Sequence, residues 1–376
     1  MKIRIFCLTL AVCCLFGATV FPCRAQKEIS VSAKSAILID ADSGMVLWDK
    51  NADTQMGMAS TTKIMTALTV LELTKPENTV VIPRDAVGIE GSSVYLCAGE
   101  RLTVEQLLYA LILSSANDAA VALALYCCGN IEAFAEQMNT MAEKLGLEYT
   151  HFTNPHGLYD EEHYTTAREL AAITRAALDN KLLCKIFATK KATIPFDGKE
   201  NGRLLVNHNK MLSYYDGAIG VKTGFTKNTG RCLVSAAKRD GMTLICVTLG
   251  APDDWRDHTA LLDYGFENFC RRTIADVGEY TFEFSVTGAA DDTVTLVNTQ
   301  PLILTLPRSA AKLEYTVTAE QPFTFAPVMR GDIIAHVSVS AYGQTASSAL
   351  ISERTLEAVD SSTSLWRKLL NLFKKD

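Results

Sequence analysis

The spacing of hydrophobic positions changes several times along the chain, and each change marks a different kind of element. Apolar residues between Val31 and Trp48 form two short runs on either side of the turn sequence Asp42-Ser43-Gly44. Two such runs around a glycine-containing turn are typical of paired antiparallel strands. The sequence therefore predicts a β-hairpin over 31–48.

Further along, apolar residues recur every three to four positions, as Ile64, Leu68 and Leu71 do in the stretch MASTTKIMTALTVLEL. This spacing predicts helices over three segments: 64–73, 103–147 and 166–178. Strand-like runs then return at 203–206 and 232–249. Strands on both sides of a helical segment indicate an α/β (α+β) domain over 26–271, with an antiparallel sheet flanked by helices and interrupted by a helical insertion.

A different pattern begins near residue 272, where apolar and polar residues alternate, as in Phe282, Phe284 and Val286. A period of two is typical of strands with one buried face. Residues 272–352 are therefore predicted to form a second, small all-β domain. A chain of 376 residues is also longer than the roughly 250–300 at which one core usually stops growing.

The two ends of the chain carry targeting signals. Residues 1–25 combine Lys2 and Arg4 with the apolar run 5–21 and a small residue at Ala25, which predicts a secretory signal peptide. The alternative is an uncleaved membrane anchor. Export would place the mature protein outside the cytoplasm.

Residues 353–376 are predicted to form a linker and an amphipathic helix. Its apolar positions are Leu365, Trp366, Leu369, Leu370 and Phe373, opposite Arg367, Lys368, Asn371, Lys374 and Lys375. Such a helix fits peripheral attachment to the outer face of the cytoplasmic membrane. The alternative is a terminal helix that docks on the protein's own domain.

Charge and cysteine content exclude several classes of function. Loss of the three basic residues in 1–25 lowers the formal net charge from −6 to −9, so nucleic acid is not an expected partner. The seven remaining cysteines lack paired spacing and are predicted to be mostly buried apolar residues rather than zinc ligands or disulfides. No metal or cofactor is expected.

Candidate chemistry begins with Ser60 and Lys63. Residues three apart on a helix share a face, so the Lys63 amine can accept the proton of the Ser60 hydroxyl, provided that burial or a nearby positive charge keeps the amine neutral. The same S-x-x-K pattern occurs at Ser235 and Ser309. Neither of these opens a predicted helix, so Ser60 is the predicted nucleophile.

Two further motifs follow in the chain. Ser115-Ala116-Asn117 offers a hydroxyl and an amide that a turn can aim inward, although serine and asparagine also cap helices. Lys222-Thr223-Gly224 leads into a predicted strand, along whose edge an extended peptide with a terminal carboxylate could bind.

The order S-x-x-K, S-x-N, K-T-G resembles the signature of the penicillin-binding protein and serine β-lactamase superfamily. Within it, the chain is most similar to the D-alanyl-D-alanine carboxypeptidases, the low-molecular-mass penicillin-binding proteins. The stretch FTNPHGLYDEEHYTTARELA and the Asn207-His208-Asn209 region add to the resemblance. It implies a DD-peptidase/β-lactamase-like fold for residues 26–271.

The resemblance also implies a role for each motif residue. Ser60 would form the acyl-enzyme, Lys63 would accept its proton, and Ser115 would relay protons. Substrate would be held by four residues: Asn117, Lys222, Thr223 and Gly224. Backbone N–H groups of Ser60 and of Phe225 or Thr226 would form an oxyanion hole. The implied activity removes the terminal D-alanine from peptidoglycan stem peptides ending in D-Ala-D-Ala, with β-lactams as inhibitors.

Three alternatives are less well supported by the sequence. A class A β-lactamase would need an E-x-x-L-N motif, which does not occur between Asn117 and Lys222. A metal hydrolase based on His151, His156 and His163, near the acidic residues 160–162, would need a spacing such as H-E-x-x-H. A peptidoglycan-binding protein without turnover would have little reason to retain buried Ser60 and Lys63.

Overall fold

The computed structural model describes residues 29–196 and 201–359. The predicted signal peptide over 1–25 and the amphipathic segment over 361–376 lie outside the described residues. Both assignments therefore remain predictions.

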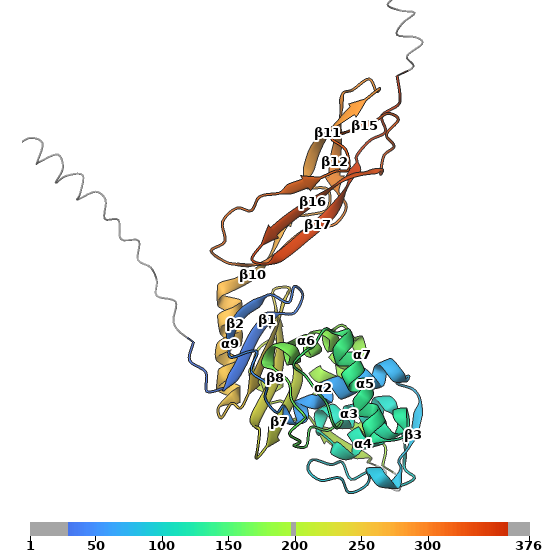
Figure 1. Ribbon diagram of the computed structural model, residues 1–376, viewed down its shortest axis with the longest axis vertical. Helices are drawn as coiled ribbons and strands as arrows, with labels where there is room; N and C mark the ends of the chain where they lie inside the picture. The colour runs from blue at the N-terminus through green and yellow to red at the C-terminus, as the bar shows by residue number, and fades with distance from the viewer. Residues whose placement is uncertain (1–28, 197–200, 360–376) are drawn as a thin grey trace, which may run out of the picture. The chain divides into compact units, whose positions relative to one another are not determined.

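A five-stranded antiparallel sheet forms the base of the larger domain (Figure 1). Its spatial order is β2-β1-β9-β8-β7, so the N-terminal hairpin pairs with strands from the far end of the domain. The strands are β2 (Val46–Lys50), β1 (Ser35–Asp40), β9 (Met242–Leu249), β8 (Gly230–Arg239) and β7 (Ala218–Thr226). The predicted hairpin is confirmed, and the predicted strand over 232–249 resolves into two strands, β8 and β9.

Both faces of this sheet are covered. Ile37 and Ile39 of β1 belong to the large core cluster on the helical side. Leu38 and Leu244 instead lie against Gly265 of α9 (Asp254–Asn268), the helix that follows the sheet. Coverage on both sides explains why every residue of β1 is buried, whereas a strand with one exposed face would alternate between buried and exposed residues.

The helical insertion lies between β2 and β7 in the chain, and the described residues place its elements at α2 (Lys63–Leu73), α3 (Val104–Leu113), α4 (Asn117–Cys128), α5 (Ile131–Lys144), α6 (Ala167–Leu178), α7 (Lys181–Ala188) and α8 (Met211–Tyr214). Two 3-10 turns, η1 (Ala59–Thr62) and η2 (Arg84–Ala86), and two short strand pairs complete it: β3 (Thr79–Val81) with β4 (Arg101–Thr103), and β5 (Lys191–Ile194) with β6 (Arg203–Val206). The insertion predicted from the sequence is therefore present.

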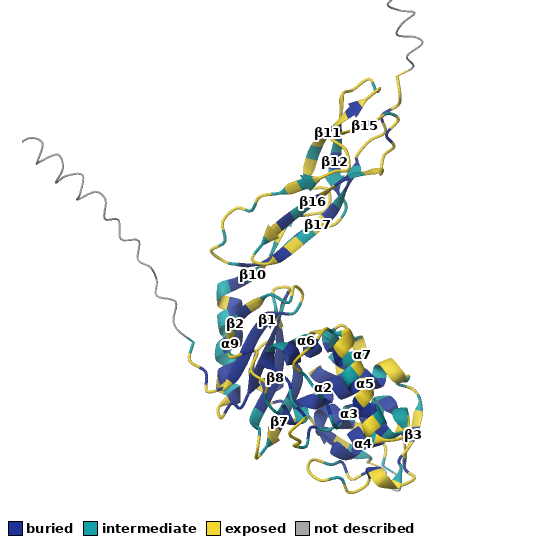
Figure 2. Ribbon diagram, in the orientation of Figure 1, coloured by how far each residue is buried: buried dark blue, intermediate teal, exposed yellow. Residues whose placement is uncertain are grey.

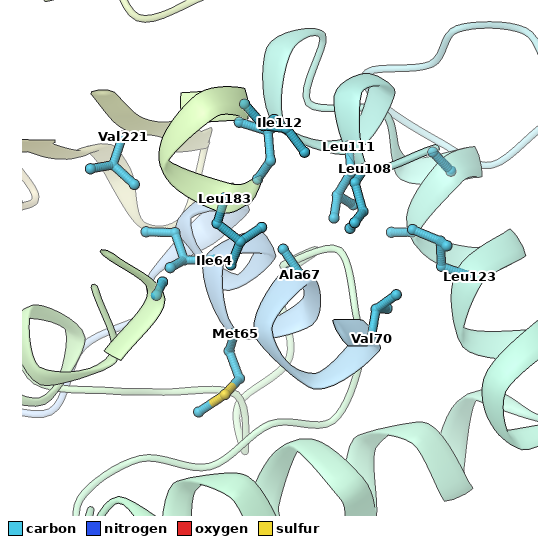
Figure 3. Packing of buried hydrophobic residues seen from close by; sticks show 14 of the residues in the cluster. Ile64, Met65, Ala67, Val70, Leu108, Leu111, Ile112, Leu123, Leu183 and Val221 are labelled. Atoms are coloured by element: carbon cyan, nitrogen blue, oxygen red, sulfur yellow. The ribbon is translucent and has the colours of Figure 1, made fainter. Parts of the chain in front are cut away.

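Helix α2 is the centre of the core. Its Ile64, Ala67 and Val70 lie in one buried cluster with Leu108 and Leu111 of α3 (Figure 3). Figure 2 shows most of the same helix in the colour of buried residues, and only its C-terminal end is exposed. A catalytic group at the start of α2 is consequently held by a closely packed element.

The second domain is all-β, as predicted. Its six-stranded sheet has the order β14-β16-β17-β12-β11-β15, and a separate pair joins β10 to β13. The strands are β10 (Phe269–Ala275), β11 (Thr281–Thr287), β12 (Thr293–Asn298), β13 (Leu302–Pro307), β14 (Thr316–Thr318), β15 (Phe323–Phe325), β16 (Ile333–Ala341) and β17 (Gln344–Ser352). Alternating residues such as Phe284, Val286 and Leu304 fill its core.

The structure continues this domain beyond residue 352, where the sequence suggested a linker. Leu356 bridges to Val328, and Ala358 bridges to Ala289. Residues 353–359 therefore belong to the folded β-domain. Backbone pairing of this kind does not depend on side-chain identity, so the sequence pattern gave no sign of it.

Two further observations concern membrane and cysteine chemistry. Among the described residues, no single helix is long and apolar enough to cross a membrane, and α4 and α5 meet that criterion only as a pair bent by 86°.

The cysteine prediction holds for Cys232 and Cys246, which are buried, but Cys97 is exposed and the other four are partly exposed. The expectation of mostly buried cysteines is therefore wrong.

Replacing Leu108, which is 0% exposed, by Ala should lower the free energy of unfolding of the larger domain by about 2–5 kcal/mol. The reason is the loss of buried methyl groups and the cavity left beside α2. The control is Leu204→Ala in β6, because Leu204 is 63% exposed and should change stability by less than about 0.5 kcal/mol. The measurement is chemical denaturation of both variants. An equal decrease in the free energy of unfolding in the two variants would contradict this account of the core.

Candidate active site

Ser60 and Lys63 lie at the junction of η1 and α2. The hydroxyl of Thr61 donates to the Met58 carbonyl at 2.6 Å, and that of Thr62 donates to the Ala59 carbonyl at 2.8 Å. These local bonds hold the tight turn that precedes the helix. Ser60 is half-buried, whereas Lys63 is completely buried as the first residue of α2.

The amine of Lys63 has three oxygen neighbours. Nζ lies 2.9 Å from Ser60 Oγ, 2.7 Å from Asn117 Oδ1 and 2.6 Å from the His156 carbonyl oxygen. Asn117 Nδ2 donates to the Glu90 carbonyl at 2.6 Å, which fixes which end of the Asn117 amide faces the lysine. The predicted pairing of Ser60 with Lys63 is therefore present in the structure.

This arrangement fits a neutral amine. The amide oxygen of Asn117 and the carbonyl of His156 can only accept hydrogen bonds, so they take the two N–H groups of an uncharged lysine. The nitrogen lone pair is then left for the Ser60 hydroxyl, which can either donate or accept. The geometry consequently directs the basic lone pair at the nucleophile.

Electrostatics act in the same direction. Burial lowers the pKa of Lys63 well below its ordinary value, the nearby positive charge of Lys222 lowers it further, and Asp118 opposes the shift. A buried ammonium is expensive to desolvate, so the group gives up its proton instead. The two causes that the sequence suggested, burial and Lys222, are the two that lower this pKa.

The second and third motifs meet on the other side of the site. Lys222 Nζ donates to Ser115 Oγ at 3.0 Å and to the Thr223 carbonyl at 2.8 Å. Ser115 is held at a φ of 56° between α3 and α4, which turns its hydroxyl toward β7. Burial lowers the pKa of Lys222 to about 7.

Asn117 and Ser115 thus contact different lysines. Asn117 contacts Lys63, and Ser115 contacts Lys222. The relay through Ser115 and the contact of Asn117 with substrate remain predictions.

Strand β7 brings the third motif to Ser60. It is the edge of the five-stranded sheet, and a Cβ added to Gly224 would lie 3.0 Å from the Ser60 backbone nitrogen and 3.1 Å from the Met58 carbonyl oxygen. Any larger residue would press on the turn that carries the nucleophile. Gly224 therefore permits the close approach on which an oxyanion hole at Ser60 and Phe225 or Thr226 would depend.

A loop at 153–158 completes the site, and sequence reasoning assigned it no role. The Pro155 carbonyl accepts from Thr66, the His156 carbonyl accepts from Lys63, and Gly157 lies so close to the Ala59 carbonyl that a Cβ there would be 1.9 Å away. The Asn154 side chain accepts from the Gly157 N–H at 2.7 Å and holds the loop in shape. The only sequence signal was the family-like stretch that contains Asn154-Pro155-His156-Gly157.

His163 fastens this loop to η1. The Thr153 N–H donates to His163 Nδ1 at 3.1 Å, so the ring proton lies on Nε2, which is 2.8 Å from Thr62 Oγ1. Burial lowers the pKa of His163 to about 4, in keeping with a neutral ring. The histidine that could have suggested a metal ligand is instead engaged with Thr62 and Thr153.

Asp118 anchors a further loop that sequence reasoning did not single out. Its buried carboxylate accepts from the Ser93 hydroxyl at 2.6 Å and from the Leu96 N–H at 3.0 Å. The Asn117 N–H also donates to the Ser92 carbonyl at 2.7 Å. Residues 90–96 are thereby fixed to the start of α4, beside Lys63.

The other S-x-x-K motifs lie in other surroundings. Ser235 is buried in β8 with its hydroxyl 2.5 Å from His258 Nδ1, and Ser309 follows β13 in the second domain. Neither opens a helix, as expected. Among the described residues, no group of three or more His, Cys, Asp or Glu side chains is arranged to hold a metal ion.

Comparison with known proteins gives a consistent result. The peptidase S11 family model, described as D-alanyl-D-alanine carboxypeptidase, matches residues 22–253. The chain belongs to this family. The DD-peptidase fold and the serine-peptidase activity expected from the sequence motifs are therefore confirmed, and the chain is a hydrolase. Members of the family act on peptidoglycan peptides ending in D-Ala-D-Ala and bind β-lactams.

Individual relatives extend the comparison. D-alanyl-D-alanine carboxypeptidase DacC of Escherichia coli is 33% identical, over 88% of this chain and 86% of its own length. DacF of Bacillus subtilis is 35% identical, over 65% of each protein. The structure of penicillin-binding protein 5 from Haemophilus influenzae superimposes with a TM-score of 0.70 at 28% identity, covering 88% of this chain and 99% of that one.

Replacing Lys222 by Met should change the pH dependence of acylation by penicillin. Lys63 acts as a base only when neutral, so acylation rises with pH through the Lys63 pKa, and removal of the Lys222 charge raises that pKa. The rising part of the plot of acylation rate against pH should therefore move to higher pH, in addition to any loss of rate. A rising part that does not move would refute the electrostatic role of Lys222, and Lys238→Met, at an exposed position of β8, is the control.

Proposed function

We propose that this protein is an exported serine D-Ala-D-Ala carboxypeptidase that removes the terminal D-alanine from peptidoglycan stem pentapeptides. The observation that carries the proposal is the contact of Ser60 Oγ with a buried Lys63 amine whose other two neighbours are obligate acceptors. Family membership supplies the substrate class.

In the proposed reaction, Ser60 Oγ attacks the carbonyl carbon of the penultimate D-alanine while its proton passes to the Lys63 lone pair. A C–O bond forms, the peptide C–N bond breaks, and the leaving D-alanine nitrogen receives a proton from Lys63 or through Ser115. Water then attacks the acyl carbon while Lys63 takes a proton from it, so that a new C–O bond forms and the ester bond to Ser60 Oγ breaks. Lys63 returns the proton to Ser60 Oγ as the shortened peptide leaves.

Substrate positioning is proposed to use the edge of β7. An extended stem peptide would pair with this strand, which places its terminal carboxylate near Lys222 and Thr223. The Lys222 amine lies beside Ser115 and supplies the positive charge that a carboxylate requires. Asn117, held between Lys63 and the Glu90 carbonyl, would contact the substrate backbone.

We also propose that the mature protein stays at the outer face of the cytoplasmic membrane. Support comes from the signal-peptide pattern over 1–25 and from the amphipathic pattern of the C-terminal segment. A role in maintaining the cell wall and cell shape follows from this location and from the proposed substrate.

Ser60→Ala should abolish covalent labelling by a fluorescent penicillin and the release of D-alanine from a pentapeptide, because the acyl-enzyme can no longer form. Ser309→Ala and Ser235→Ala, at the two other S-x-x-K motifs, should remain labelled. Persistent labelling of the Ser60 variant would overturn the site assignment. Labelling of the unaltered protein without D-alanine release would favour a peptidoglycan-binding protein without turnover.

Removal of residues 361–376 should shift the protein from the membrane fraction to the soluble fraction while D-alanine release is retained, because the proposed site residues all lie between Ser60 and Thr226 in the chain. The measurement is fractionation followed by penicillin labelling of both fractions. Unchanged fractionation would count against the C-terminal anchor.

A further inference from the structure

The curled sheet of the β-domain encloses a groove between its two edge strands. β14 and β15 are opposite edges in the strand order, yet only residues 319–322 separate them in the chain. Five Cα-to-Cα steps span at most about 17 Å, so the two edges must lie near each other. Both strands line a groove with a volume of about 560 Å³, at the end of the sheet where β11 and β15 lie side by side (Figure 1).

The groove has both apolar and polar lining residues, the polar ones being Thr318, Glu320, Gln321, Thr324 and His336. Phe284 and Ala335 form a buried floor, whereas three large side chains on the rim remain exposed: Phe323 at 37%, Phe325 at 62% and Ile333 at 65%. The rings of Phe323 and Phe325 pack edge to face, with centroids 5.2 Å apart. An exposed apolar cluster beside a free strand edge is the kind of surface that a further segment covers.

The chain itself leaves the described region next to this groove. The Val359 N–H donates to the Gly288 carbonyl at 2.8 Å, and the preceding Thr287 pairs with Phe325. The seventeen residues 360–376 therefore begin within two strand positions of the groove rim. A helix over 365–373 would be about 13 Å long and about 10 Å across, so its apolar face, but not the whole helix, would enter a groove of this volume.

Charge favours this segment over a lipid surface as the occupant. Residues 276–359 contain ten acidic and four basic residues, whereas 360–376 contain four basic and two acidic residues. Anionic headgroups would repel the acidic domain, but the basic segment is attracted to it. The apolar side chains of the segment, Leu365, Trp366, Leu369, Leu370 and Phe373, match the apolar rim in kind.

We propose that residues 364–373 dock in the groove between β14 and β15 when no membrane is present. Docking uses the same apolar side chains that a membrane interface would bury, so the two states compete. Only the undocked segment can enter lipid. The apparent membrane affinity is therefore the affinity of the undocked segment multiplied by the fraction of time that the segment is undocked. The inference concerns the C-terminal segment and is independent of the chemistry at Ser60.

Tryptic cleavage of the full chain without lipid tests the proposal, since Arg367 and Lys368 are cleavage sites inside the segment. A segment docked for about nine-tenths of the time is cleaved about tenfold more slowly than a free one. The double variant Phe325→Thr, Ile333→Thr should remove that protection. Val277→Thr is the matched control, because Val277 is also 62% exposed but does not line the groove. D-alanine release should be unchanged in every variant.

The proposal predicts slow cleavage in the unaltered chain and in Val277→Thr, fast cleavage in the double variant, and tighter binding of the double variant to vesicles containing anionic lipid. Equal cleavage rates in all three proteins would overturn it. Weaker vesicle binding of the double variant would assign the groove to the membrane, and protection that rises with protein concentration would assign it to a second copy; either result overturns intramolecular docking. If no variant binds vesicles but the cleavage difference persists, docking stands and the proposed membrane anchor fails.

Discussion

The amine of Lys63 is completely buried, and its three neighbours at hydrogen-bonding distance are uncharged oxygens. A charged ammonium in this place would lose its hydration without gaining a carboxylate partner, a cost of several kcal/mol by the usual estimates. The neutral form avoids that cost and fits the available acceptors. The ability of Lys63 to act as a base toward Ser60 is thus a consequence of packing, because the helix that forms the core also buries the Lys63 amine.

Much of the surrounding fold serves to bring backbone close to this amine. Gly157 and Gly224 lie where a side chain would collide with the turn carrying Ser60, so the absence of a Cβ lets a loop and a strand approach from two sides. The loop contributes the His156 carbonyl, and the strand contributes Lys222. The approach of the strand depends on the sheet order, which leaves β7 at the edge of the sheet.

The second domain is organised by a different constraint. Its sheet is curled but not closed, which leaves apolar rim residues beside the point where the described chain ends. If the basic amphipathic segment has both this groove and a lipid surface available, one set of side chains serves two destinations. The acidic character of the domain then favours the segment and disfavours direct lipid contact.

The sequence by itself determined the chemistry and most of the elements. Ser60 and Lys63 are three residues apart across the junction of η1 and α2, so their contact needed only local geometry. The helical and alternating patterns indicated α6, β6 and β11. What the tertiary structure alone decided is which partners each lysine has. The acceptors at Glu90 and His156 are backbone carbonyls, which every residue possesses, and Asp118 and His163 act through loops distant in the chain. Only the folded chain brings such groups together, because no spacing or residue type distinguishes them beforehand.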